Sequence, residues 1–112
     1  MCPANNTFTD EGEIYSPGYP SSNSSSLTCE YFMAAEEDRH VLIEFPEIVL
    51  AAGDSITLYE GETSANVITT LNSTTQPGGI YQTSTDNVLR MVYQAGPDIR
   101  ARSWHAKFMT VF

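Results

Sequence analysis

The chain has 112 residues, which suffices for one domain with one modest hydrophobic core. Its fourteen acidic and five basic residues give a formal net charge of −9, which disfavours nucleic acid and anionic membranes as partners because both attract cationic surfaces. Cations and basic protein patches are the partners that such a surface attracts, although solubility alone also explains the charge.

The chain has two cysteines, Cys2 and Cys29. Neither belongs to a C-x-x-C motif, and His40 and His105 are single and far apart, so a zinc site lacks ligands at suitable spacing. We therefore expect a Cys2–Cys29 disulfide. It would close a loop of about 27 residues and contribute roughly 3 to 3.5 kcal/mol in the chain-entropy model.

Three Asn-x-Ser/Thr triplets, at Asn5, Asn23 and Asn72, are candidate N-glycosylation sites. Together with a disulfide they favour an oxidising, extracellular location. Met1 directly before Cys2 indicates a start codon placed on a domain excised from a longer extracellular protein. We therefore treat residues 1–112 as a single domain.

The segment SPGYP, residues 16–20, predicts a fixed bend after a short extended piece. Each proline disfavours the helical region for the residue before it, and Gly18 after Pro17 suits a turn that needs a positive φ. Tyr15 precedes this bend, and Tyr19 lies within it.

Beyond the bend, apolar and polar residues alternate with a period of two in short segments, and helical periodicity is nearly absent. Seven or more strands at spacings of about 8 to 12 residues are typical of an antiparallel sandwich or barrel. The polar segment 34–40 and the glycines at 78–79 are interpreted as hairpin connections. The strand-like segments are residues 26–34, 40–45, 54–61, 66–71, 78–84, 87–94 and 103–112.

Cys2, Gly12, Ile14, the SPGYP bend and Cys29-Glu30-Tyr31 together resemble the start of the CUB domain, an extracellular β-sandwich module. Later segments resemble further parts of that family in the same order, namely VLIEF at 41–45, GDSITLYEG at 53–61, NVLRMVY at 87–93 and WHAKF at 104–108. The resemblance implies an all-β fold, an antiparallel two-sheet sandwich of jelly-roll type without substantial helix. The expected shared core is Ile14, Tyr31, Phe45, Ile56, Leu58, Leu89, Met91, Trp104 and Phe108.

The chain departs from the family pattern in two ways. The second disulfide that most members carry is absent, because residues 50–54 and 70–75 contain no cysteine. Of the three carboxylates that bind calcium in many members, only Asp54 is retained, since the other two positions fall at Ala51 and near Gly96. We therefore expect no cofactor. The alternative is a calcium site at Asp54 that recruits Glu47 and Asp98 after a shift of a few residues, and the simpler role for Asp54 is to cap a turn.

The resemblance implies a protein-interaction module for adhesion or recognition that binds an extracellular protein partner, with a basic patch as one option, through loops at one end of the sandwich. Arg100 and Arg102 place positive charge beside that end. The residues that we expect there are Tyr15, Glu47, Asp54, Asp98 and Arg100.

Catalysis is not expected, because the chain has no G-x-S-x-G motif and His40 and His105 are interpreted as a loop residue and an outward strand residue. Two alternatives to the adhesion module stay open. One is a self-assembling secreted, matrix or coat protein that forms homo-oligomers through the edge or face of its last strand, residues 104–112. The other is calcium-dependent ligand binding.

Overall fold

The computed structural model describes residues 2–21, 25–63 and 65–112, and these form a β-sandwich, as predicted. No helix occurs among these residues, and hence none long and apolar enough to cross a membrane. The strands are β1 (Thr7–Thr9), β2 (Gly12–Tyr15), β3 (Leu27–Ala34), β4 (His40–Val49), β5 (Ser55–Glu60), β6 (Val67–Leu71), β7 (Ile80–Gln82), β8 (Val88–Ala95) and β9 (Ser103–Val111).

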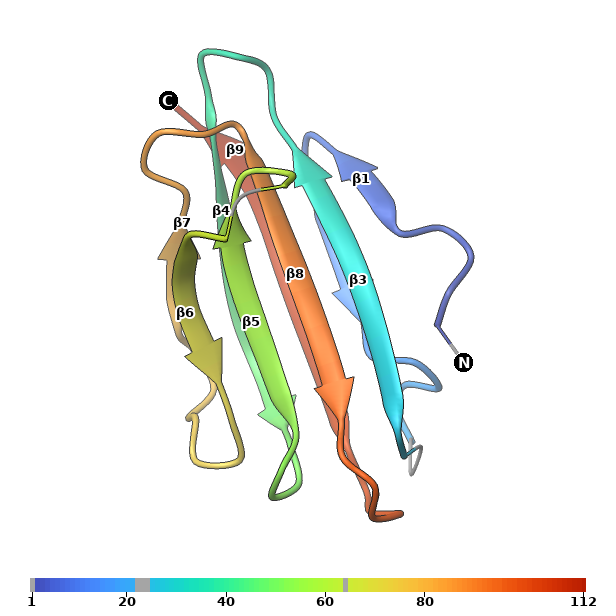
Figure 1. The fold of residues 1–112 in the computed structure, drawn as a ribbon. Coiled ribbons are helices and arrows are strands. Elements are labelled where there is room, and N and C mark those ends of the chain that lie inside the picture. Colours follow the sequence, from blue (N-terminus) through green and yellow to red (C-terminus); the bar gives the residue numbers. More distant parts are fainter. Residues whose placement is uncertain (1, 22–24, 64) are drawn as a thin grey trace.

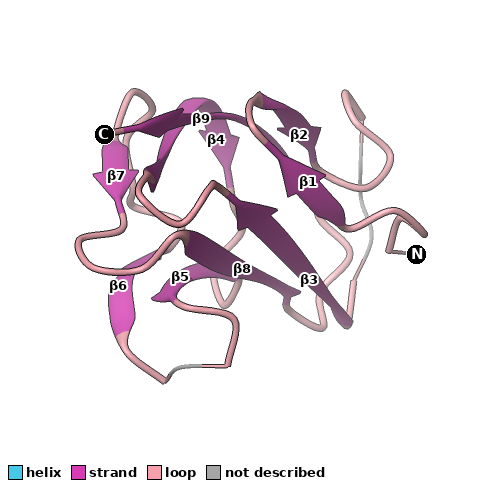
Figure 2. Ribbon diagram, turned by 90° about the horizontal axis from the view of Figure 1, so that it is seen from above, coloured by secondary structure: helices cyan, strands magenta, loops and turns pink. Residues whose placement is uncertain are grey.

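The strands are arranged in two layers that face each other (Figures 1 and 2). One sheet has the order β1-β3-β8-β5-β6 and the other β2-β9-β4-β7. All neighbouring strands are antiparallel except β1, which pairs in parallel with β3. The alternation of buried and exposed residues along β3, β8 and β9 matches the period-two pattern of the sequence.

Two connections differ from the expectation. The segment 34–40 does not close a hairpin, because β3 and β4 belong to different sheets and the chain crosses between layers here. The same holds for the glycines at 78–79, which lie between β6 and β7. Local composition predicts a turn correctly in both places, but it carries no information about which strand the chain pairs with next.

The core between the layers contains all nine residues that were predicted for it, and each is less than 5% exposed. Trp104 lies at its centre. The rings of Tyr31 and Tyr93 meet the Trp104 ring edge-on, with centroids 5.7 Å and 5.4 Å away. Such contacts add roughly 0.5–1.5 kcal/mol each beyond the burial of apolar area.

The predicted disulfide joins Cys2 to Cys29 and ties the N-terminal segment to β3. The SPGYP bend leaves edge strand β2, with Gly18 at a φ of 78° and a cis peptide bond between Tyr19 and Pro20. Ser16 fixes this bend to β9: its amide donates to the carbonyl of Trp104 and its hydroxyl accepts from the amide of Trp104.

The last strand is not a sheet edge, which corrects the expectation that it could pair with a second copy. β9 lies between β2 and β4 and pairs with β4 from Ser103 to Val111 and with β2 from His105 to Phe108. From His105 to Phe108 the strand therefore has a neighbour on both sides, and this part of it offers no free edge for pairing with a second copy.

Candidate functional site

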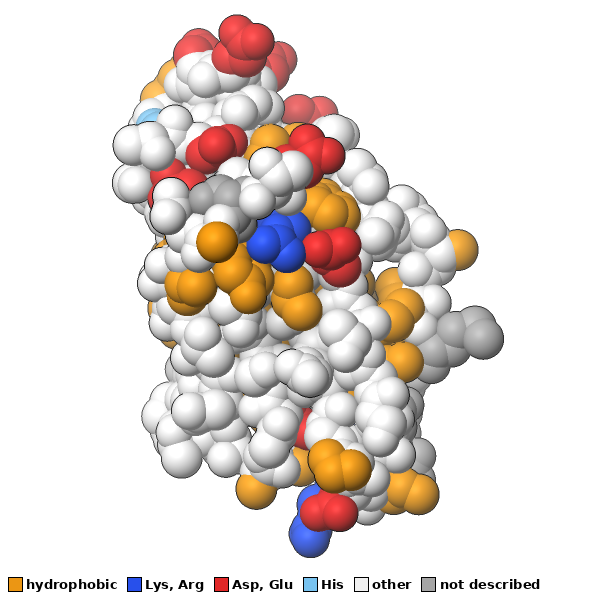
Figure 3. All heavy atoms as spheres, in the orientation of Figure 1, with side chains coloured by type: hydrophobic (Ala, Val, Ile, Leu, Met, Phe, Trp, Pro, Cys, Tyr) orange, Lys and Arg blue, Asp and Glu red, His pale blue; other side chains and the backbone are white. Residues whose placement is uncertain are grey.

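Four connections gather at one end of the sandwich, the lower end in Figure 1: those between β2 and β3, β4 and β5, β6 and β7, and β8 and β9. We call this the loop end. In Figure 3 its surface shows basic, acidic and apolar side chains close together, whereas acidic side chains dominate the opposite end. The three acidic residues of the β3–β4 connection, Glu36, Glu37 and Asp38, belong to that opposite end.

Asp54 lies beneath the loop end and is only 3% exposed. Its carboxylate accepts hydrogen bonds from the backbone amides of Ala51 and Gly96, each at 2.7 Å. Its own amide donates to the carbonyl of Ala51 at 3.0 Å. Asp54 therefore caps the turn before β5 and also joins this turn to the β8–β9 loop.

Arg102, the residue before β9, completes this arrangement. Its Nε donates to Oδ2 of Asp54 at 2.6 Å, and neither side chain is exposed. Its two terminal nitrogens donate to the carbonyls of Asp98 at 2.6 Å, Arg100 at 3.2 Å and Gly96 at 3.4 Å. One guanidinium thus holds three carbonyls of the β8–β9 loop around a buried carboxylate.

Arg102 and two backbone amides affect the pKa of Asp54. Burial alone would raise this pKa, but the hydrogen bond from Arg102 and those from the amides of Gly96 and Ala51 outweigh it. The pKa of Asp54 consequently lies below its ordinary value, and the carboxylate is charged at neutral pH.

The tip of the β8–β9 loop projects from this anchored base. Ile99 is 72% exposed. Beside it, the side chains of Asp98 and Arg100 are exposed and form a loose ion pair of 3.8 Å. An isolated, highly exposed isoleucine on a loop that is fixed from below is an available apolar contact for a partner.

A second group of side chains lies on the outer face of β2, β9 and β4. The Tyr15 ring stacks on His105 at 4.4 Å with an interplanar angle of 5°, and Tyr19 packs against Tyr15 at 4.9 Å. We call Tyr19, Tyr15 and His105 the aromatic row. Glu13 and Glu47 flank it: Nε2 of His105 lies 2.6 Å from Glu13, and the Tyr19 hydroxyl donates to Glu47.

Both tyrosine hydroxyls of the aromatic row stay protonated at neutral pH. Burial, followed by the neighbouring Glu13 carboxylate, raises the pKa of Tyr15. The hydrogen bond to Glu47, followed by burial, raises the pKa of Tyr19. Each hydroxyl therefore acts as a neutral donor toward a carboxylate.

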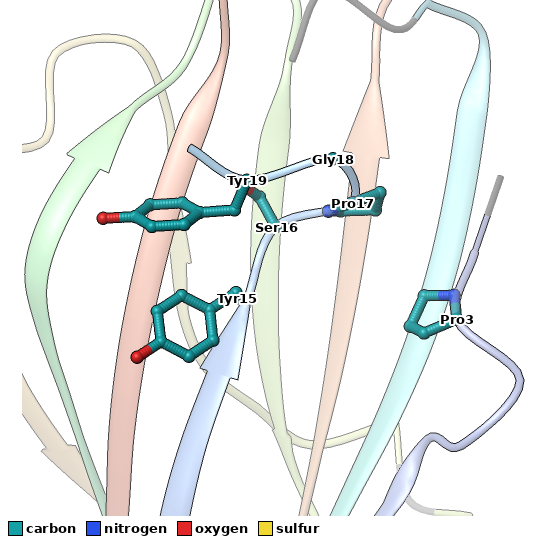
Figure 4. Close-up of a pocket in the computed structure, with 6 residues that line it drawn as sticks. All are labelled: Pro3, Tyr15, Ser16, Pro17, Gly18 and Tyr19. Carbon is teal, nitrogen blue, oxygen red and sulfur yellow. The ribbon is translucent and has the colours of Figure 1, made fainter. Parts of the chain in front are cut away.

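The same bend forms a groove of about 580 Å³. Figure 4 shows that Tyr15 and Tyr19 project to one side of the bend, whereas Pro17 and Pro3 lie on the other. The groove is lined by Pro3, Tyr15, Ser16, Pro17, Gly18 and Tyr19.

The residues expected at the site fall into three places. Tyr15 and Glu47 meet around Tyr19, Asp98 and Arg100 lie on the loop tip, and Asp54 is buried underneath. Sequence reasoning missed Ser16, Tyr19, His105 and the role of Arg102. The tyrosine inside the SPGYP bend is a sequence signal for Tyr19, but no local motif links Arg102 to a carboxylate 48 positions away.

Of the three candidate glycosylation sites, Asn5 and Asn72 are exposed, and Asn23 lies outside the described residues. The Asn72 side chain accepts hydrogen bonds from the amide and hydroxyl of Thr74. Modification at these asparagines stays a prediction.

The residues around Asp54 do not fit a calcium ion. Calcium takes six to eight oxygen ligands, usually including several carboxylates, and the described part of the chain contains no group of three or more acidic, histidine or cysteine side chains arranged to bind a metal. Glu47 is held by Tyr19 and Ser103, and the Asp98 side chain points to solvent near Arg100. The lone pairs of Asp54 that would face a metal are taken by two amides and a guanidinium.

Comparison with known proteins agrees with this architecture. The family model described as CUB domain matches residues 2–108. The chain belongs to the CUB domain family. CUB domains generally mediate protein–protein interactions.

Among curated proteins, the chain is similar to cubilin of Canis lupus familiaris, with 31% identity over 105 residues and 89% of this chain, and to cubilin of Homo sapiens, with 31% identity and 87% coverage. The chain spans only 3% of the length of these relatives.

Among solved structures, the fold is similar to the CUB1-EGF-CUB2 domains of rat MASP-1, with a TM-score of 0.79 and 19% identity over 94% of this chain and 42% of that chain. For the full extracellular region of zebrafish Gpr126/Adgrg6, the TM-score is 0.78 and the sequence identity 25%, over 96% of this chain and 14% of that chain. For the MASP-1 CUB2 domain bound to Ca²⁺, the TM-score is 0.69 and the sequence identity 21%, over 93% of this chain and 96% of that chain.

Proposed function

We propose that this CUB domain is a non-catalytic recognition module of an extracellular protein and binds a protein partner through its loop end. The observation that carries the proposal is the anchoring of the β8–β9 loop by Arg102. The guanidinium holds the carbonyls of Asp98 and Arg100 on either side of the exposed Ile99, and a loop that is ordered before binding loses less entropy when a partner binds.

The chemistry of the loop end suggests the kind of partner. Ile99 offers an apolar anchor between one acidic and one basic side chain. The aromatic row offers flat ring surface with the carboxylates of Glu13 and Glu47 beside it. Tyrosine is enriched at the centres of protein interfaces, and carboxylates next to rings favour a partner with lysine or arginine. We therefore infer a partner surface that combines an apolar pocket with a basic patch.

Two observations support an extracellular location and a non-catalytic role. The disulfide between Cys2 and Cys29 persists in oxidising surroundings, and one structural relative is an extracellular region. The His105 ring is stacked on Tyr15, and its Nε2 is paired with Glu13. This nitrogen is therefore engaged within the aromatic row and is not placed to activate a nucleophile.

The proposal is tested by capture from native extracellular fluid on the immobilised domain, comparing Ile99→Asp with wild type. The matched control is Val67→Asp, because Val67 is 54% exposed on edge strand β6, away from the aromatic row and the β8–β9 loop. We expect a protein that wild type and Val67→Asp retain and Ile99→Asp loses. Equal retention by all three variants would contradict binding through the loop end.

Sedimentation velocity at micromolar concentration separates this function from self-assembly. We expect a monomer. A stable dimer or larger species would favour the assembly alternative, and it would have to use a surface other than residues 105–108 of β9, which are paired on both sides.

A further inference from the structure

We infer that Arg102 is a built-in cation that does at this loop end what a bound divalent metal ion would otherwise do, so that the β8–β9 loop is ordered without metal. The inference concerns how the loop end is held together, and it stands or falls independently of the partner proposed above.

The donor set around the guanidinium is that of a cation site. Among the described residues, the oxygen atoms around the guanidinium include one carboxylate, from Asp54, and three backbone carbonyls, from Gly96, Asp98 and Arg100. All are oxygen atoms, the ligand type that hard cations prefer. Here the cation is covalently attached to β9, and its planar set of N–H donors replaces coordination bonds by directed hydrogen bonds.

The same geometry excludes a second cation. Both members of the Asp54–Arg102 pair have fully buried side chains, so the repulsion between a metal ion and the guanidinium would be poorly screened by water. In addition, the amides of Ala51 and Gly96 direct their hydrogens at the carboxylate oxygens. The site therefore offers a metal neither free carboxylate oxygens nor a neutral cavity.

Positions 51 and 96 are the points at which the arginine could be exchanged for a metal. Both backbones contact the Asp54 carboxylate directly. A Cβ atom at Gly96 would lie 3.4 Å from Oδ1 of Asp54 and 3.5 Å from the backbone of Gly53, and its φ lies outside the left-handed region, so the backbone there accepts a side chain. Ala51→Glu and Gly96→Asp would add two further carboxylates on the two segments whose backbones contact Asp54.

The first test uses wild type alone. Its melting temperature is measured with EDTA, with millimolar Ca²⁺ and with millimolar Mg²⁺. We expect the three values to agree within about 1 °C, because a ligand that does not bind the native state does not stabilise it. A rise of several degrees with Ca²⁺ and not with Mg²⁺ would overturn the inference.

The second test asks whether Arg102 is the group that replaces the metal. Calorimetric titration with Ca²⁺ compares the double variant Ala51→Glu/Gly96→Asp with the triple variant that adds Arg102→Ser. We expect the triple variant to bind Ca²⁺ with a Kd of about 1 mM or tighter, the range of extracellular calcium modules, and the double variant to show no binding or at least tenfold weaker binding.

Each result of this comparison either supports the inference or contradicts it. A triple variant that folds only when Ca²⁺ is present supports the inference, and a folded triple variant that ignores Ca²⁺ overturns it. Calcium binding by the double variant, with Arg102 in place, that is less than tenfold weaker than binding by the triple variant also overturns it. If the triple variant folds neither with nor without Ca²⁺, two results together support the inference: the double variant binds no Ca²⁺, and the melting temperature of wild type does not change with Ca²⁺.

Discussion

Nε of Arg102 lies 2.6 Å from Oδ2 of Asp54, and both side chains are withdrawn completely from solvent. The pair joins the β4–β5 turn to the β8–β9 loop. It therefore connects the sandwich, which is shared across the CUB family, with the loop tip that we propose as a recognition surface.

Breaking this pair should destabilise the domain strongly. Arg102→Met leaves a buried carboxylate without its cation, and removal of one partner of a buried ion pair costs about 3–5 kcal/mol. The double variant Asp54→Asn/Arg102→Met should lose less free energy of unfolding than the sum of the two single variants. Urea denaturation measures the free energy of unfolding of wild type, the two single variants and the double variant. If the loss in the double variant equals the sum of the two single losses, a direct interaction between the two residues is contradicted.

Acid should unfold the domain through carboxylates that are charged in the folded state. Hydrogen bonds from the backbone and hydroxyls of Thr85 and Ser84 outweigh the effect of burial and lower the pKa of Glu60 to about 2, and the pKa of Asp54 is lowered as well. A depressed folded pKa stabilises the folded state above the unfolded pKa, and this stability is lost as the pH falls toward the folded value. We expect stability to fall between about pH 5 and pH 2.

Glu60→Gln provides the check on this assignment. The amide keeps the size of the side chain but removes its titration, so the loss of stability between pH 5 and pH 2 should become smaller than in wild type. Chemical denaturation at several pH values measures it. An unchanged pH dependence would show that Glu60 has a similar pKa in the folded and unfolded chain.

The disulfide should contribute measurably because it closes a loop of 27 residues. Replacing Cys2 and Cys29 by alanine should lower the free energy of unfolding by about 2–5 kcal/mol. The short β1 strand, which pairs with β3 next to this bond, should lose amide protection first. Equal urea midpoints for the oxidised protein and the alanine variant would refute this contribution.

Tyr31→Phe should leave stability unchanged or raise it by about 1 kcal/mol. The Tyr31 hydroxyl is buried and has no hydrogen-bond partner among the described residues, and burial raises its pKa strongly. Removing an unsatisfied polar group abolishes its desolvation cost while the ring keeps its contact with Trp104. A loss of more than 1 kcal/mol in thermal or urea unfolding would reveal a hidden partner of the hydroxyl.

The parts of this fold that the sequence predicts are those governed by local chemistry. The SPGYP bend follows from two prolines and a glycine at φ 78°, and the core follows from alternation along single strands, as the burial of Trp104 and Phe108 shows. The pairing of Cys2 with Cys29 follows because the chain has no other cysteine.

The parts that it does not predict depend on long-range topology. The crossing between sheets at 34–40 and the central place of β9 are set by which strands pair, and no turn residue encodes that choice. The partner of Arg102 is 48 positions away, and that of Tyr19 is 28 positions away. Asp54 was recognised as a turn cap or calcium ligand, but the cation that faces it could be identified only from the structure.

Amide hydrogen exchange in metal-free buffer tests most directly whether Arg102 orders the recognition loop. The amides of Ala51 and Gly96, which donate to Asp54, should be protected in wild type, and Arg102→Met should abolish this protection while amides in the middle of β3 and β8 keep theirs. Rapid exchange of Ala51 and Gly96 in the wild-type protein without metal would contradict the account.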